Sequence, residues 1–305
     1  MEEVSVLAPA TVANVVCGFD CLGFALSEPT DEMTVRKIDE KRVRIINRDR
    51  FDLPTEAKEN VAGAALLAML EKLEVDFGFE VESTKHIKPG SGIGSSAASA
   101  VGVVVAANAL LDERFSELEL IEFAMAGEFI ASQGRHADNV APCFFGGFTL
   151  VRSVNPLDIV ALDFPLMFVT VIHPQIEIKT SEARKMLPLQ VPLKKAIRQW
   201  GNVGALVAAL SKGNYDLISR SLEDFLIEPV RKILIPKFDE IKFESLNVGA
   251  LGGGISGSGP SIFMLSRNLE TAHKVENVMR KIYERTTIDF NIYVTKINAG
   301  GVKFV

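Results

Sequence analysis

The stretch KPGSGIGSS, residues 88–96, carries the strongest structural signal in the chain. It lies between an alternating apolar segment at 77–82, which predicts a strand, and an Ala- and Val-rich segment at 97–111, which predicts a helix. Its three glycines let the backbone turn and approach an anion closely, and the helix offers free N–H groups and the positive end of its dipole. Ser95 and Ser96 add hydroxyls that suit a phosphate or Mg²⁺. The stretch therefore predicts a phosphate-binding loop.

Other nucleotide-binding motifs do not match this loop. A Walker loop ends in Gly-Lys-Ser/Thr, and no lysine stands at that place. The pattern from Gly92 to Ala97, with Asp112 beyond it, imitates a dinucleotide fingerprint, but the helix leaves no room for the second strand that such a site needs. The triplet Asp-Phe-Gly at 76–78 spells a protein-kinase metal motif, but no His-Arg-Asp loop accompanies it, so we interpret it as chance.

A second glycine-rich segment, GGGISG, lies at 252–257. It also spells G-x-G-x-x-G, but Pro260 and an expected strand at 261–265 follow it in place of a helix, which excludes a dinucleotide site. A lone loop of this kind is most often a structural turn. Two such loops in one chain, both with serines, favour a shared anion site.

The rest of the chain alternates helices and strands without a strict βαβ rhythm. We expect a strand at 4–7 that leads into a loop at 8–22, a helix capped by Thr55, and a helix at 116–130. Further strands are expected at 33–46, 143–151, 159–172 and 290–296, and further helices at 180–186, 193–211, 215–225 and 270–284. This pattern indicates an α+β fold class. The length of 305 residues favours two domains, which we place at 1–164 and 165–305.

Composition and charge narrow the class of protein. Apolar residues make up 48% of the chain and charged residues 24%, which excludes a disordered or collagen-like chain. The formal net charge of −6 disfavours a dedicated nucleic-acid binder and favours small-molecule chemistry. Cys17, Cys21 and Cys143 are too few for a disulfide framework and are expected as free thiols. We expect no signal peptide and no membrane-spanning segment, and therefore a soluble cytoplasmic protein that binds neither nucleic acid nor membrane.

Three separated segments together resemble the GHMP small-molecule kinases. APATVAN at 8–14 with GFDCLG at 18–23 is similar to the first motif of that family, the loop at 88–98 to the second, and LGGGISGSGP at 251–260 to the third. Their order and spacing match the family over essentially the whole chain. The resemblance implies a two-domain GHMP kinase fold, with an N-terminal domain like the second domain of ribosomal protein S5 and a ferredoxin-like C-terminal domain. It places the active site in the cleft between them.

Further segments are similar to the members of the family whose acceptor is L-homoserine. These are HADNVAP at 136–142, SEAR at 181–184, and EPVR at 228–231 with LIP at 234–236. The reaction implied is transfer of the γ-phosphoryl group of ATP to the side-chain hydroxyl of L-homoserine, a step of threonine biosynthesis. The run VVC at 15–17 departs from the usual first motif, which leaves the shape of the substrate pocket open.

The same resemblance assigns roles at the phosphate end of the site. It implies that ATP is bound by Lys88, Pro89, Gly90, Ser91, Gly92, Ile93, Gly94, Ser95, Ser96, Ala97 and Ala98. It implies Mg²⁺ ligation by Ser96 and Glu128. The loop of the third motif contributes Gly254, Ser256, Gly257, Ser258 and Gly259.

At the acceptor end, the charges of homoserine suit the residues that the family motifs place there. Its carboxylate suits the guanidinium groups of Arg184 and Arg231, and its ammonium suits Asp20. The candidates for holding the hydroxyl in line with the γ-phosphate, and for catalysis, are Asn14, His136 and Asn139. Because an amide cannot take a proton, Asn139 predicts transfer without a protein base, and the neighbouring Asp138 is the rival base.

Other functions stay open at this point. A different small alcohol as acceptor, such as mevalonate or shikimate, would keep the enzyme class. A sensor that binds ATP and a metabolite without turnover belongs to another class, and the presence of Ser96, Glu128 and the glycine loop argues against it. A ribosomal-type nucleic-acid module is disfavoured by the charge of −6. The resemblance also implies a homodimer, which nothing else in the sequence indicates.

Overall fold

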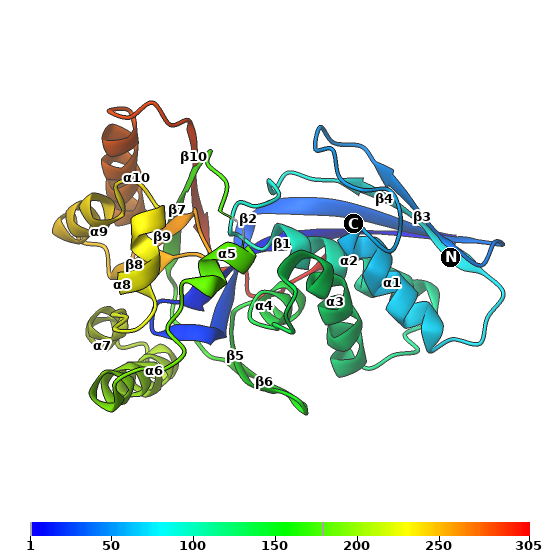
Figure 1. The fold of residues 1–305 in the computed structure, drawn as a ribbon, viewed down its shortest axis with the longest axis horizontal. Coiled ribbons are helices and arrows are strands. Elements are labelled where there is room, and N and C mark those ends of the chain that lie inside the picture. Colours follow the sequence, from blue (N-terminus) through cyan, green and yellow to red (C-terminus); the bar gives the residue numbers. More distant parts are fainter. Residues whose placement is uncertain (1, 179) are drawn as a thin grey trace.

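The computed structural model describes residues 2–178 and 180–305, which form two β-sheets with their helices (Figure 1). The larger, seven-stranded sheet consists of β1 (Glu3–Val15), β2 (Gly18–Ile38), β3 (Val43–Asn47), β4 (Gly78–Thr84), β5 (Phe148–Val154), β6 (Leu157–Leu162) and β11 (Lys303–Phe304). The smaller sheet has the order β10-β7-β9-β8 and consists of β7 (Phe168–Pro174), β8 (Gly252–Ile255), β9 (Ile262–Ser266) and β10 (Phe290–Lys296).

Helices cover one face of the larger sheet (Figure 1). They are α1 (Val61–Glu71), α2 (Ser95–Leu110), α3 (Glu117–Ser132) and α4 (Val140–Phe145). Helix α2 lies against β1 and β2 and is buried along most of its length, as its small Ala, Ser and Val side chains allow. The opposite face of β2, β3 and β4 carries ion pairs of Arg36, Arg44 and Arg48 with Glu80 and Glu82.

The smaller sheet is covered on both faces. Its strands send alternate side chains to α9 (Phe238–Asn247) and α10 (Leu269–Tyr283) on one side and to α6 (Leu193–Lys212) and α7 (Tyr215–Ser221) on the other. Burial of both faces explains why all seven residues of β7 are buried. Three short elements, α5 (Thr180–Lys185), α8 (Glu228–Arg231) and the 3₁₀ turn η1 (Lys232–Leu234), connect these layers.

The expectation of a loop at 8–22 is wrong, because this segment forms the end of β1, the turn and the start of β2 in a β1–β2 hairpin. The register shifts between Pro9 and Thr11 and again between Ala13 and Val15. Asn14 and Asp20 adopt φ values of 58° and 57°. These irregularities break the simple alternation by which a strand is recognised, yet they keep the chain paired across the sheet.

Three smaller expectations also need correction. Asn60, and not Thr55, caps α1, because its side chain accepts hydrogen bonds from the backbone N–H groups of Ala62 and Gly63. The expected strand at 143–151 begins as the last turn of α4, and β5 starts at Phe148, after the helix ends at Gly146 with φ of 76°. The expected strand at 159–172 is two strands, β6 and β7, from different sheets.

The α+β class is confirmed, and the strand order of the smaller sheet is that of a ferredoxin-like domain. The chain passes from the larger to the smaller sheet between Leu162 and Phe168. Strand β11 returns to the larger sheet, where it pairs with β1. The boundary at 164/165 stays a prediction. In the described part of the chain, every helix is too short or too polar to cross a membrane.

Candidate active site

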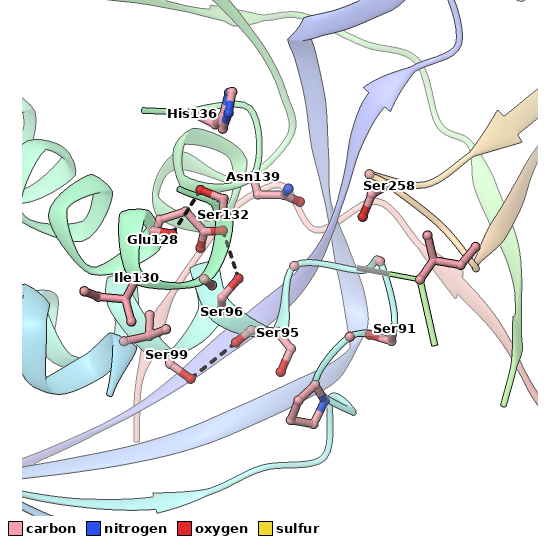
Figure 2. A pocket seen from close by; sticks show the side chains of 18 of the residues that line it. Ser91, Ser95, Ser96, Ser99, Glu128, Ile130, Ser132, His136, Asn139 and Ser258 are labelled. Atoms are coloured by element: carbon pink, nitrogen blue, oxygen red, sulfur yellow. Dashed lines mark hydrogen bonds between the residues drawn. The ribbon is translucent and has the colours of Figure 1, made fainter. Parts of the chain in front are cut away.

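A cavity of about 490 Å³ is lined by residues from both halves of the chain (Figure 2). From the first half it takes the segment before α1, the loop after β4, the start of α2, the end of α3 and the start of α4. From the second half it takes residues of α5, α8 and the loop after β8. Asn14 and Gly257 both line it although they lie 243 residues apart in the sequence. The cavity therefore gathers all three glycine-containing motifs at one place.

The loop between β4 and α2 has the shape that an anion site requires. Gly92 and Gly94 adopt φ values of 81° and 71°, and no side chain of the described residues caps the first turn of α2. Its backbone N–H groups are therefore available to a ligand. A Cβ atom on Gly94 would lie 2.0 Å from Thr11 Oγ1, and one on Gly92 would lie 2.5 Å from the carbonyl oxygen of Gly259. Both positions thus require glycine for space as well as for conformation.

Hydroxyl groups of the third motif and of Ser261, the residue after it, form hydrogen bonds with the backbone of this loop. Ser256 Oγ donates to the Gly92 carbonyl at 2.7 Å, and Ser261 Oγ donates to the Ser91 carbonyl at 2.6 Å. The Gly257 N–H donates to the carbonyl of Ala13 at 3.1 Å and so joins the third motif to the first. Gly257 and Ser258 line the cavity, whereas Gly254, Ser256 and Gly259 support it from outside.

Four of the residues expected at the nucleotide do not line the cavity. Ile93, Ala97 and Ala98 are buried in the core below the loop, so they can reach a phosphate only through their backbone. The ammonium group of Lys88 donates to Gln175 Oε1 at 2.7 Å, just past the end of β7. Pro89, Gly90, Ser91, Gly92, Gly94, Ser95 and Ser96 do line the cavity.

Ser96 and Glu128, the expected metal ligands, face each other in the cavity (Figure 2). Ser96 Oγ donates to Glu128 Oε1 at 3.0 Å, and the buried Glu128 Oε2 has no hydrogen-bond partner among the described residues. Burial raises the pKa of Glu128 to about 7, against the opposing effect of the hydrogen bond from Ser96. A buried carboxylate oxygen without a partner, beside a hydroxyl, fits a hard divalent cation.

The acceptor end of the cavity contains a charge pair. Arg184 donates to both carboxylate oxygens of Asp20, at 2.8 and 3.1 Å, although the two residues lie 164 positions apart. Arg231 is buried beside them, with its Nε donating to the carbonyl of Ala183 at 3.3 Å. Both guanidinium groups lie over the ring of Phe19, at 5.5 Å for Arg184 and 5.0 Å for Arg231. The residues expected to bind the two charges of the acceptor are therefore together.

The three polar candidates for the hydroxyl also reach this region, but in different ways. Asn14 uses both ends of its amide on the backbone, because Nδ2 donates to the Gly257 carbonyl and Oδ1 accepts from the Asp20 N–H, each at 2.8 Å. His136 Nδ1 lies 3.8 Å from Asp20 Oδ1, and burial lowers the His136 pKa against the effect of that carboxylate. Asn139 Oδ1 accepts from Thr11 Oγ1 at 2.7 Å. The Asn14 side chain thus fixes the backbone around the site, while His136 and Asn139 still have polar atoms that can bind a ligand.

Asp138, the rival base, also lines the cavity and is buried. Burial raises its pKa to about 7, and the charge of Asp20 adds to the increase. Its carbonyl oxygen lies where a Cβ on Gly23 would stand, at 1.9 Å, so the hairpin packs directly against this segment. Asp138 therefore lines the same cavity as Asp20, with a carboxyl pKa well above its usual range.

A buried network that was not predicted from the sequence lies beneath the phosphate loop. Lys85 Nζ donates to Asp31 Oδ2, to the Ser95 carbonyl at 3.0 Å and to Ser99 Oγ at 2.7 Å. Asp31 Oδ1 accepts from the backbone N–H groups of His86 and Ile87. A signal was present, because Lys85 continues the inward-facing alternation of Phe79, Val81 and Ser83, where a lysine needs a buried partner.

Two family models match the chain. The GHMP kinases N terminal domain matches residues 60–147, which include the phosphate loop, Glu128 and Asn139. The GHMP kinases C terminal model matches residues 206–285, which include Arg231 and the third motif. The chain therefore belongs to the GHMP kinases, and the expected two-domain GHMP kinase fold is confirmed.

Within that family, the similar curated proteins are homoserine kinases. The homoserine kinase of Chloroherpeton thalassium is 42% identical over 319 residues, covering 100% of both chains. That of Pyrococcus furiosus is 39% identical over 297 residues, covering 97% of this chain and 98% of the relative. The crystal structure of homoserine kinase from Cytophaga hutchinsonii superposes with a TM-score of 0.96 at 48% identity, covering 100% of this chain and 98% of that one. Mevalonate kinase of L. major, at 18% identity and a TM-score of 0.72, shares the fold.

Proposed function

We propose that this protein transfers the γ-phosphoryl group of ATP to the side-chain hydroxyl of L-homoserine, giving ADP and O-phospho-L-homoserine for threonine biosynthesis. The observation that carries the proposal is the Asp20–Arg184 pair in the same cavity as the phosphate loop. An amino-acid zwitterion offers an ammonium to Asp20 and a carboxylate to Arg184. Its binding would therefore replace the Asp20–Arg184 ion pair by two ion pairs with the ligand. The similarity to homoserine kinases at 42% identity supports the same acceptor.

The nucleotide occupies the opposite end of the cavity in this proposal. The backbone N–H groups at the start of α2 and the glycine loop bind the phosphates. Leu53, Pro54, Val61 and Ile130 line the far wall and provide apolar surface for the adenine ring. The γ-phosphate then lies between α2 and the acceptor charges.

Ser96 and Glu128 would hold Mg²⁺ beside the phosphates, which is supported by the unpartnered Glu128 Oε2. Among the described residues, His, Cys, Asp and Glu side chains form no cluster of three or more that encloses a metal. This agrees with Mg²⁺ chemistry, because the ion takes one or two protein oxygens and completes its shell with phosphate and water. When bound, Mg²⁺ neutralises charge on the transferring phosphoryl group.

The chemical step in this proposal needs little beyond positioning. The acceptor oxygen forms a bond to the γ-phosphorus while the bond from that phosphorus to the bridging oxygen of ADP breaks. Arg184, Arg231 and Asp20 fix the two charges of homoserine, and Asn139 holds its hydroxyl. The hydroxyl proton leaves with the transferred phosphoryl group, so no side chain has to accept it.

Replacing Asp138 by asparagine tests the absence of a base. We expect Asp138→Asn to keep kcat within about tenfold of the unmodified protein, whereas loss of a general base costs about 10²–10⁴-fold. A base at Asp138 works only when deprotonated, so kcat would then rise as the pH passes about 7, its pKa. We expect parallel pH profiles for the two proteins instead. An inactive but folded Asp138→Asn variant would contradict the proposal. Both Asn139→Ala and Asn139→Asp should lower kcat.

Replacing Arg184 by alanine tests the acceptor site. We expect KM for L-homoserine to rise about 100-fold or more, because a charge-assisted bidentate contact is lost and Asp20 is left unpaired. KM for ATP should change less than about threefold, and Arg231→Ala should show the same selectivity if it remains folded. Lys185→Ala, an exposed neighbour on α5, is the matched control. Equal effects on both KM values would assign the arginines to the nucleotide or the fold.

A coupled assay of ADP release with L-homoserine, mevalonate, shikimate, galactose and no acceptor tests the function itself. Turnover with homoserine alone is the expected result. Mevalonate and shikimate carry a carboxylate but no ammonium, so each would leave Asp20 facing an anion without a partner. Binding of ATP without turnover of any acceptor would favour the sensor function.

We extend the proposal to a homodimer that acts in the cytoplasm, as the family resemblance implies. Helix α6 offers a surface for such contact, because Leu193, Ile197 and Trp200 are exposed at helical spacing along it. Light scattering distinguishes a chain of 33.2 kDa from an assembly of two.

A further inference from the structure

Thr11 lies between the two ends of the active site. It is a fully buried residue of β1, and its backbone N–H donates to the carbonyl of Ile93 in the phosphate loop at 3.1 Å. Its side-chain Oγ1 donates to Asn139 Oδ1 at 2.7 Å. One residue therefore contacts both the phosphate loop and the amide that faces the acceptor hydroxyl.

The hydrogen bond from Thr11 decides which way the Asn139 amide faces. A buried hydroxyl proton needs an acceptor, and Asn139 Oδ1 is the acceptor that the described residues provide. Asn139 stands at the N-cap of α4 but makes no capping hydrogen bond with its side chain. With Oδ1 bound to Thr11, Nδ2 is the end of the amide that remains for a ligand in the cavity, which Asn139 lines (Figure 2).

We propose that Thr11 is a positioning residue, which turns the Asn139 amide so that Nδ2 donates to the acceptor hydroxyl oxygen. The inference rests on the proposed phosphoryl transfer to homoserine. An N–H donor at that oxygen leaves the hydroxyl proton directed elsewhere, toward the phosphate, as transfer without a base requires. A flipped amide would present Oδ1 instead and draw the hydroxyl proton away from the phosphate.

The packing around Gly94 adds a second role for Thr11. A Cβ atom on Gly94 would lie 2.0 Å from Thr11 Oγ1 and 3.1 Å from Asn139 Oδ1. The residue that precedes α2 is thus in direct contact with the Thr11–Asn139 pair. Thr11 and Asn139 therefore pack against the residue from which α2 starts.

The test compares Thr11→Val with Thr11→Ser in the full-length protein. Valine keeps the volume and the backbone N–H but removes the hydroxyl, whereas serine retains it. We expect Thr11→Val to lower kcat about 10- to 100-fold while KM for ATP changes less than about threefold, and Thr11→Ser to recover most of the activity. The matched control is Thr149→Val, a buried threonine of β5 whose hydroxyl has no partner among the described residues, and it should leave kcat unchanged.

A double-mutant cycle separates positioning from a structural role. If Thr11 acts through Asn139, then Thr11→Val added to Asn139→Ala should lower kcat by no more than about twofold. A further loss equal to that of the single Thr11→Val variant would overturn the inference.

A second readout does not depend on turnover. The side-chain amide signals of Asn139 in a ¹⁵N spectrum, identified by their absence in Asn139→Ala, should shift in Thr11→Val and return in Thr11→Ser. Unchanged signals would overturn the inference. Absence of homoserine turnover in the unmodified protein would contradict the proposed function instead, and this spectrum would still decide the Thr11–Asn139 contact.

Discussion

Replacing Glu128 by glutamine is expected to lower kcat about 1000-fold with L-homoserine as acceptor. Glutamine keeps the size of the side chain and an oxygen for Ser96, but it provides no negative charge for a cation. Electrostatic stabilisation by a bound metal ion contributes several kcal/mol to a transition state, which corresponds to about three powers of ten in rate. The measurement is kcat at increasing Mg²⁺ concentration.

A binding measurement accompanies this assay. Calorimetric titration of ATP in the presence and absence of Mg²⁺ should show that Glu128→Gln loses most of the effect of the metal. Glu122→Gln, an exposed acid on the same helix α3, is the control and should behave like the unmodified protein. If Glu128→Gln retained its rate and its Mg²⁺ response, the assignment of Glu128 as a metal ligand would be wrong.

Replacing Lys85 by methionine is expected to lower the free energy of unfolding by about 3–5 kcal/mol. The exposed fractions of the Lys85 and Asp31 side chains are 3% and 0%, so methionine leaves a buried carboxylate without its cation. The Ser95 carbonyl and Ser99 Oγ lose their donor as well. Urea denaturation, with the midpoint and slope compared, measures the loss.

Two further variants make this prediction specific. Lys85→Met combined with Asp31→Asn should be more stable than Lys85→Met alone, because the uncompensated buried charge is removed. Lys88→Met, three positions along the chain, loses one hydrogen bond to Gln175 and should cost only about 1 kcal/mol. Equal losses in Lys85→Met and Lys88→Met would mean that the buried network does not stabilise the fold.

Glycine-rich sequences favour a flexible backbone, and the same network explains how this loop nevertheless keeps a defined shape. Ser95 Oγ donates to the Ile87 carbonyl at 2.8 Å, so the two ends of the loop are joined directly. Lys85 and Asp31 hold those ends from below, while Ser256 and Ser261 hold the loop from the side of the smaller sheet. An ordered loop keeps its N–H groups aimed at the phosphates without paying the ordering entropy on binding.

The helices and strands that are specified by residues close together in the sequence were predictable. Ser116 caps helix α3 through a capping box with Glu119, and β10 spans the expected residues 290–296. The hairpin of β1 and β2 was not predictable as paired strands, because Pro9 and the bulges hide its alternation. Asn60 was missed as a cap because Thr55 offers the same chemistry a few residues earlier, and only the packing of α1 selects between them.

Glycine spacing, serine positions and motif order were enough to determine the family. They also predicted a turning backbone at Gly92 and Gly94, which adopt the positive φ values that glycine permits. Tertiary structure alone decided which polar groups meet. The family motifs assign Asp20 and Arg184 to one acceptor site, but not the ion pair that they form across 164 positions. Thr11 reaches Asn139 across 128 positions, and no local pattern specifies that contact. The physical reason is that hydrogen bonds and charges act over a few ångströms in space, whereas sequence signals extend only over a few residues.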